Sequence, residues 1–182
     1  MVMIRDEVPA DFEAREALLD ASFGDARFAK ASERLREGRR PAHGLCLSAV
    51  HERALAGTVR LWHIEAGSAG NGLLLGPLAV DADKRSLGIG SRLMREALWR
   101  AARAGHRFVL LVGDSSYYAR FGFEPAPASL DMPGPVDRTR FLAFEIIPGA
   151  LSGAEGILAA SGERVDRRHT HPELAHELRL AA

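Results

Sequence analysis

Apolar and polar positions along this chain come in blocks whose lengths are typical of strands and helices. The stretch 44–64 predicts a β-hairpin, two strands around a turn at Glu52 and Arg53. After residue 148 the apolar pieces become short, and they predict no further clear element. Other apolar runs predict strands at about residues 2–5, 72–80 (GLLLGPLAV), 106–113 (HRFVLLVG) and 140–147 (RFLAFEII).

Apolar residues at helical spacing predict three longer helical segments. The first begins with Asp11 as its N-cap and continues to Phe23. The second covers residues 27–36 and stops at Gly38. The third covers 88–104, with charged residues on its outer face. Its apolar stripe consists of Ile89, Leu93, Ala97 and Ala101, widened by Met94 and Leu98.

The order of these elements predicts a layered fold of mixed α and β structure. A single helix separates the strands 72–80 and 106–113, and such a crossover makes the two strands parallel neighbours. The remaining strands favour antiparallel pairing. We therefore expect an α/β (or α+β) fold, a mixed and mostly antiparallel sheet flanked by helices. With no repeat or linker, residues 1–160 are predicted to form one domain, and 161–182 a polar C-terminal extension.

Composition narrows the classes of function. The chain of 182 residues has 24 basic and 24 acidic side chains, so it lacks the basic excess of a general nucleic-acid or acidic-membrane binder. Cys46 is the only cysteine, which excludes an intrachain disulfide and a cysteine-based metal cluster. The beginning of the chain lacks a signal-peptide pattern, and no apolar stretch approaches the roughly 18 residues of a membrane span. These features predict a cytoplasmic protein.

Two glycines stand at the start of the third helix, in the stretch RSLGIGSR (85–92). A helix N-terminus presents unpaired N–H groups and a partial positive charge, and glycine lets a phosphate approach them closely. A phosphate-binding loop of the GxxxxGK[ST] kind is absent, and a dinucleotide fingerprint would need glycine at Leu93. Gly88 and Gly90 therefore predict a pyrophosphate site, and close packing at the helix start remains the alternative.

The segment from Gly72 to Ala126 resembles the core of the GNAT superfamily of acetyl-CoA-dependent N-acetyltransferases. Its residues 85–90, RSLGIG, match the family pattern [QR]-x-x-G-x-[GA] in full, and YARFGF (118–123) matches the downstream Tyr-x-x-x-Gly-Phe. The runs GPLAV, GDSSYYARFGF and RFLAFEIIPGAL further resemble a bacterial group of uncharacterised predicted acetyltransferases. The resemblance implies that this chain has the GNAT fold and uses acetyl-CoA as its cosubstrate.

The resemblance also implies which residues hold coenzyme A. In the family, the glycine loop wraps the pyrophosphate and the preceding strand pairs with the pantetheine arm. Many relatives have glycine where Ser86 stands and a polar or basic residue where Leu87 stands, which leaves the route of the loop open. The implied cofactor-binding residues are Leu78, Ala79, Val80, Arg85, Ser86, Leu87, Gly88, Ile89, Gly90 and Ser91.

Transfer of an acetyl group to an amine requires protonation of the leaving thiolate. A thiol has a pKa of about 8.5 and a phenol one of about 10, so a tyrosine is a suitable proton donor. The family resemblance assigns this role to Tyr118, within a short helix capped by Asp114 or Ser115. Two alternatives remain open: Tyr118 packs the helix against the sheet, or the neighbouring Tyr117 is the acid.

Other parts of the site are less well defined by the sequence. The general base stays open, because water can also accept the proton of the amine; candidates by residue type are His63, Glu52, His51 and Glu65. Three basic side chains are candidates for the phosphates or for a solvated surface: Lys84, Arg85 and Arg92. The histidines of the tail predict a polar surface rather than a metal site: His169, His171 and His176.

The sequence thus predicts an acetyl-CoA-dependent N-acetyltransferase that acts by direct transfer in a ternary complex, without a metal. The alternatives are a non-catalytic acyl-CoA-binding sensor or interaction module, and a nucleotide-binding protein that uses the same helix end. The acceptor is expected to be an amine of a small molecule or a protein, held by variable loops near residues 20–42 and 124–140. A monomer or a homodimer is expected.

Overall fold

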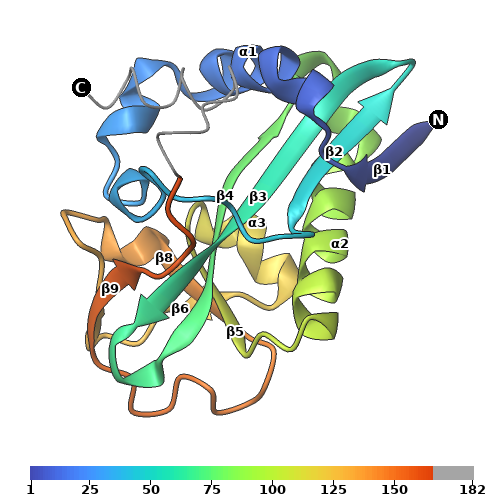
Figure 1. Cartoon of the computed structure of the whole chain (residues 1–182). Helices are drawn as coiled ribbons and strands as arrows, with labels where there is room; N and C mark the ends of the chain where they lie inside the picture. Colours follow the sequence, from blue (N-terminus) through green and yellow to red (C-terminus); the bar gives the residue numbers. More distant parts are fainter. Residues whose placement is uncertain (166–182) are drawn as a thin grey trace.

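The computed structural model describes residues 1–165, which form a mixed sheet flanked by helices (Figure 1). The order of strands in the main sheet is β1-β2-β3-β4-β5-β8-β6, and β9 pairs with the far end of β3 and with β7. The strands are β1 (Val2–Asp6), β2 (Cys46–His51), β3 (Ala54–Ala66), β4 (Asn71–Val80), β5 (Phe108–Val112), β6 (Glu124–Pro125), β7 (Leu130–Asp131), β8 (Phe141–Glu145) and β9 (Gly156–Ala160).

The strands β4 and β5 are parallel neighbours, as predicted from the single helix that joins them. Their pairing is short, Leu73 with Val109 and Leu74 with Leu110, and beyond it the two strands diverge. Pro77 lies in the diverging half of β4 and has no N–H group to donate to a neighbouring strand. The main sheet is otherwise antiparallel, so the predicted fold class is confirmed.

Helices cover both faces of the sheet (Figure 1). The helix α1 (Phe12–Phe23) contacts β3 and β4, and α2 (Ile89–Arg103) contacts β2, β3 and β4. The short α3 (Ser115–Tyr118) follows β5. The 3-10 helices are Pro9–Asp11, Asp25–Ala29, Glu33–Leu35, Gly67–Ala69, Ala82–Leu87, Ala119–Phe121 and Arg138–Arg140.

Successive strand residues supply two separate apolar layers. Leu61 and Leu73 belong to the cluster that α2 completes, whereas their neighbours Trp62 and Leu74 belong to the cluster on the other face. This division follows from the alternation of side chains along a strand. Burial on both faces explains why β4 and β5 appear in the sequence as nearly continuous apolar runs.

Two N-terminal predictions are corrected by the structure. Asp11 does not cap α1 with its side chain; its carboxylate accepts hydrogen bonds from Arg5, at 2.6 and 2.7 Å, and from Ser48 at 2.8 Å. The segment 27–36 is not one helix but parts of two 3-10 helices. Its only fully buried apolar side chain is Leu35, so packing does not support a longer helix there.

The C-terminal part adds a strand that the sequence pattern did not indicate. The strand β9 pairs Ile64 with Ala160, and its Leu158 is buried. Three of its five residues are glycine or alanine, and Ile157 is exposed, so Leu158 is its only buried large side chain and its apolar pattern is weak. Residues 161–165 continue beside residues 38–40, where the Val165 N–H donates to the Gly38 carbonyl at 3.0 Å.

Further predictions concern the tail and the membrane. The tail histidines at positions 169, 171 and 176 lie outside the described residues. The boundary between a domain at 1–160 and an extension at 161–182 stays a prediction. None of the helices within residues 1–165 has the length and apolar character needed to cross a membrane.

Candidate active site

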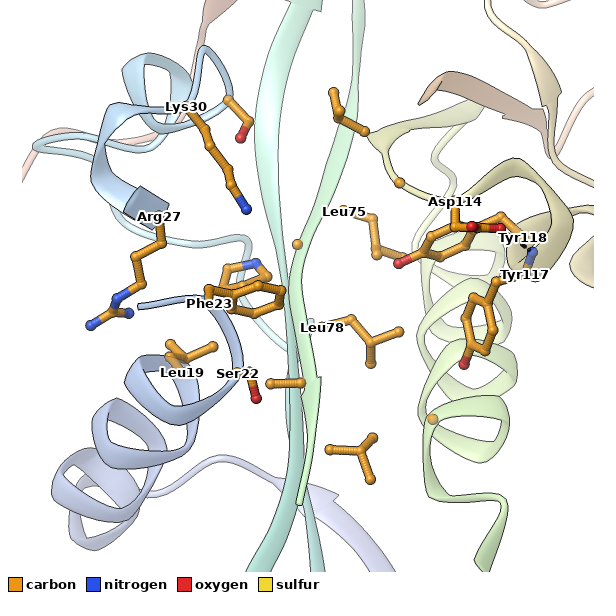
Figure 2. Close-up of a pocket in the computed structure, with 18 of the residues that line it drawn as sticks. Leu19, Ser22, Phe23, Arg27, Lys30, Leu75, Leu78, Asp114, Tyr117 and Tyr118 are labelled. Atoms are coloured by element: carbon orange, nitrogen blue, oxygen red, sulfur yellow. Dashed lines mark hydrogen bonds between the residues drawn. The ribbon is translucent and has the colours of Figure 1, made fainter. Parts of the chain in front are cut away.

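A cavity of about 840 Å³ opens where β4 and β5 diverge (Figure 2). Strand β4 forms its centre, α1 and the following 3-10 segments lie on one side, and α3 lies on the other. The start of α2 also contributes to its wall. Segments that are far apart in sequence therefore meet around one space.

One edge of β4 in this cavity has no strand partner among residues 1–165. Leu78, Ala79 and Val80 pair on their other edge with β3 and line the cavity. The main-chain N–H and C=O groups on the free edge are available to an extended ligand, which can pair with them as an added strand would. The geometry therefore fits an extended arm along residues 78–80.

The N-terminus of α2 supplies main-chain donors to the same cavity. Gly88, at φ 67° and ψ 18°, is the N-cap residue and has a left-handed conformation that favours glycine. No side chain caps the helix, so its first N–H groups are left for a ligand or for water. Gly88, Gly90 and Ser91 line the cavity, and an anion there would also gain from the helix dipole.

The structure brings together most, but not all, of the predicted cofactor-binding residues. Arg85 and Ser86 join the cavity wall with the glycines and with residues 78–80. Ile89 instead is fully buried in the core beneath α2, and Leu87 is exposed outside the lining. The motif is contiguous in sequence, but successive residues at a helix start point in different directions, so not all of its side chains face the cavity.

The three cations proposed near the phosphates differ in their surroundings. Arg85 is exposed and lines the cavity. The Lys84 ammonium is 2.7 Å from an oxygen of Asp81, and neither Lys84 nor Arg92 lines the cavity. Only Arg85 of the three is therefore placed to contact a ligand in this cavity.

The two adjacent tyrosines of α3 point in different directions. The Tyr118 hydroxyl lies in the gap near Leu75 of β4, whereas the Tyr117 hydroxyl points toward the start of α2 (Figure 2). The carboxylate of Asp114 caps α3 by accepting the Tyr117 N–H at 2.9 Å. The Tyr118 ring also packs on Phe123, with 5.7 Å between ring centres. Tyr118 thus combines the predicted packing role with a hydroxyl that faces the cavity.

Both phenols are held in the protonated form. Burial raises the pKa of Tyr118 well above its usual value, and the positive charge of Arg140 only partly opposes this. Burial also raises the pKa of Tyr117, while a hydrogen bond with Ser91 and the charge of Arg120 lower it. Each group is therefore a hydrogen-bond donor at neutral pH.

None of the four candidates for a general base lines the cavity. His63 lies beside His106, with 5.4 Å between ring centres, and Glu65 is exposed near the end of β3. His51 and Glu52 lie at the hairpin between β2 and β3. Residue type alone suggested these four candidates, and the structure places none of them at the cavity, so the general base stays unassigned.

Several lining residues come from ranges in which the sequence singled out no individual side chain, or from outside those ranges. Phe23 and Lys30 come from α1 and the segment after it, within the predicted acceptor range 20–42. Trp62 of β3 lies beside β4, and its indole N–H donates to the Gly76 carbonyl at 2.7 Å. From the second predicted range, 124–140, only Arg140 lines the cavity. Arg140 lies between Asp137 and β8, and no motif around it indicates that it lines a cavity.

Comparisons with known proteins agree with this arrangement. Residues 42–125 match the family model of the acetyltransferase (GNAT) domain. The uncharacterised N-acetyltransferase YhbS of Escherichia coli K12 is 31% identical over 159 residues, which cover 86% of this chain and 95% of the relative. The chain belongs to the GNAT family of acetyltransferases.

Solved structures of GNAT proteins place the resemblance in three dimensions. The crystal structure of Escherichia coli YhbS in complex with CoA has a TM-score of 0.73 and 27% identity, covering 96% of this chain and 92% of that one. A GNAT acetyltransferase from Brucella melitensis, in complex with acetyl-CoA, has a TM-score of 0.59 and 28% identity, covering 79% and 96%.

For this GNAT protein the predicted family, fold class and enzyme class, N-acetyltransferase, are confirmed. The predicted similarity to uncharacterised bacterial acetyltransferases is confirmed by YhbS. Within residues 1–165, no group of three or more histidine, cysteine or acidic side chains is arranged to hold a metal ion.

Proposed function

We propose that this GNAT protein transfers the acetyl group of acetyl-CoA directly to a primary amine within a ternary complex. The observation that carries the proposal is the convergence of three features on one cavity. These are the free edge of β4 at residues 78–80, the uncapped start of α2 at Gly88, and the hydroxyl of Tyr118. The complexes of the two structural neighbours with CoA and acetyl-CoA support the choice of cosubstrate.

The described residues fit coenzyme A in one direction. The N–H groups at Gly88, Gly90 and Ser91, with the guanidinium of Arg85, would hold the pyrophosphate. The free edge at 78–80 would pair with the pantetheine arm. This placement leads the thioester end toward Leu75, where β4 and β5 part and the Tyr118 hydroxyl lies (Figure 2).

Direct transfer needs one bond formed and one broken. The neutral amine forms the new C–N bond at the thioester carbonyl, and the C–S bond breaks. Tyr118 then donates its phenolic proton to the departing sulfur and regains a proton from solvent, while the amine loses its own proton to water. Tyr117 is the alternative donor, although its hydroxyl points toward α2 rather than toward Leu75.

Cys46 is unsuited to carry an acetyl group as a covalent intermediate. It lies outside the cavity lining, and burial raises the pKa of its thiol to about 11. The reactive form of a cysteine is the thiolate, which is scarce at neutral pH when the pKa is so high. This favours a ternary complex over an acyl-cysteine intermediate.

The experiment is a pair of substitutions at Gly88, combined with an assay for CoA release across a panel of amines. Gly88→Asn and Gly88→Asp have the same shape, and both residue types tolerate the left-handed conformation. We expect Gly88→Asp to weaken CoA binding by about tenfold or more relative to Gly88→Asn, because its charge repels the phosphates. Equal affinities in calorimetry would contradict the phosphate site.

The same assay separates the enzyme from the alternatives. We expect amine-dependent release of CoA from acetyl-CoA, and weaker binding of ATP than of CoA. Tight acetyl-CoA binding without acetylation of any amine would favour the sensor. A preference for ATP would favour a nucleotide-binding protein. The cytoplasmic location and the choice between monomer and homodimer stay predictions.

A further inference from the structure

Lys30 brings a positive charge into the cavity from the side of α1, opposite α3 (Figure 2). Its ammonium lies 4.8 Å from the centre of the Phe23 ring. Partial burial of the Lys30 side chain lowers its pKa, and the positive charges of Arg140 and Arg36 lower it further. The positive charges of Arg36 and Arg140 thus disfavour the charged form of Lys30.

The other cations on this side are already paired with carboxylates. Arg27 is 2.6 Å from Glu16 and 2.9 Å from Asp20, and its guanidinium points away from the cavity (Figure 2). Arg36 is 3.4 Å from Glu33. Their charges are therefore largely compensated within the protein.

Lys30 and Arg140 form no such ion pair within residues 1–165, although the charge of Arg140 adds to the local hydrogen bonds that lower the pKa of Asp114 and of Asp137. Among residues 1–165, no carboxylate lies within ion-pair distance of either side chain. Glu37 also lines the cavity but is exposed, and it is not among the charges that act most on Lys30. Within the described part of the chain, the cavity therefore holds two side chains, Lys30 and Arg140, whose positive charges have no carboxylate at ion-pair distance.

The position of both residues is fixed by the fold. Arg140 precedes β8, and its carbonyl accepts the Gly113 N–H at 2.9 Å beside the start of α3. The charge of Arg140 lowers the pKa of both Tyr118 and Lys30, and both Arg140 and Lys30 line the cavity. The segment that carries Lys30 is anchored by the buried Leu35.

We propose that the acceptor is an amine with an anionic group, a carboxylate or a phosphate, and that Lys30 and Arg140 bind this group while the amine faces Tyr118. The proposal rests on the proposed acetyl transfer in this cavity. Arginine and lysine are the usual partners of carboxylates and phosphates, through charge-assisted hydrogen bonds. An anion here would relieve the repulsion between the two cations and would orient the amine.

The test uses two pairs of amines that differ in the anionic group: β-alanine with β-alaninamide, and phosphoethanolamine with ethanolamine. CoA release is measured for the unchanged protein and for Lys30→Met and Arg140→Met. Both side chains are exposed, so we expect these variants to fold. The control is Arg95→Met, which removes an exposed cation outside the cavity lining.

We expect the anionic member of at least one pair to be the better acceptor. Lys30→Met and Arg140→Met should each raise its KM by about ten- to a hundredfold, as expected for the loss of a hydrogen bond to a charged group. The KM of acetyl-CoA and the KM values of β-alaninamide and ethanolamine should stay unchanged. The response to the phosphate pair and the carboxylate pair tells which anion is bound.

Three results would overturn the proposal. The first is equal acetylation of the amines with and without the anionic group. The second is an equal response of both members of a pair to Lys30→Met, and the third is a rise in the KM of acetyl-CoA alone. If no amine is acetylated, binding of the four amines to the protein–CoA complex is measured by calorimetry. Binding of an anionic amine that Lys30→Met weakens would support the anion site while the proposed transfer fails; no such binding would overturn the site as well.

Discussion

In the proposed reaction, the hydroxyl of Tyr118 protonates the leaving thiolate. It lies in the gap between β4 and α3, and burial keeps it protonated. General acid catalysis typically contributes about 10²–10⁴-fold, so Tyr118→Phe should lower kcat by a factor within or just below this range. Acetyl-CoA affinity should change little, because the ring and its packing remain. Steady-state kinetics and calorimetry measure the two effects.

The matched control for this substitution is Tyr117→Phe, for which we expect a much smaller loss of kcat. The pH dependence provides a second check. Because burial raises the pKa of Tyr118 above its usual value of 10, ionisation of this group should cause no loss of kcat below about pH 10. An alkaline loss with an apparent pKa of about 8 that disappears in Tyr118→Phe would contradict the assignment.

The contact between α2 and α3 depends on the absence of a side chain at Gly90. A Cβ atom at this position would lie 2.6 Å from the Tyr117 hydroxyl, but 3.8 Å from the ring carbon that carries it. Alanine normally favours a helix over glycine by about 1 kcal/mol. Here the contact should reverse this preference, so Gly90 has a packing role in addition to its proposed role at the phosphates.

We therefore expect Gly90→Ala to destabilise the protein by about 1–3 kcal/mol, the usual range for overpacking. In a Tyr117→Phe background the clash is absent, and the same substitution should be neutral or should stabilise the protein by up to about 1 kcal/mol. Urea unfolding of the four proteins in this double-mutant cycle measures the coupling. Equal destabilisation in both backgrounds would show that the Tyr117 hydroxyl is not the cause.

Asp11 connects three parts of the whole molecule. Its carboxylate binds Arg5 of β1 and Ser48 of β2 from the start of α1, and it accepts the Val8 N–H at 3.1 Å. Hydrogen bonds from Arg5, with smaller contributions from Val8 and Ser48, lower the pKa of Asp11 from its ordinary 3.8 to about 2. A lowered pKa means that the folded protein prefers the carboxylate, so Asp11 stabilises the fold above about pH 4.

This stabilisation should be lost as the pH falls from about 4 through 2. We expect Asp11→Asn to reduce the free energy of unfolding at pH 7 by about 1–2 kcal/mol and to flatten its dependence on pH between 4 and 2. Urea unfolding across this range provides the measurement. Asp25→Asn, at an exposed position, is the control. An identical acid profile for Asp11→Asn and the unchanged protein would contradict the role of Asp11.

The sequence by itself determined the elements whose evidence is local. The apolar stripe of α2 and the continuous apolar runs of β4 and β5 indicated a parallel crossover, because periodicity within a segment reports which sides are buried. The RSLGIG motif indicated the family and the start of α2. This evidence is also local, because neighbouring residues specify a helix N-terminus and its glycines.

Only the tertiary structure decided which side chains meet in the cavity. It turned Tyr118 toward β4 and Tyr117 toward α2, and it buried Ile89 beneath the motif to which it belongs. It also brought Lys30 and Arg140 to one cavity although 110 positions separate them in the chain. Such contacts depend on how distant elements pack against the sheet, and no pattern within either segment specifies that packing.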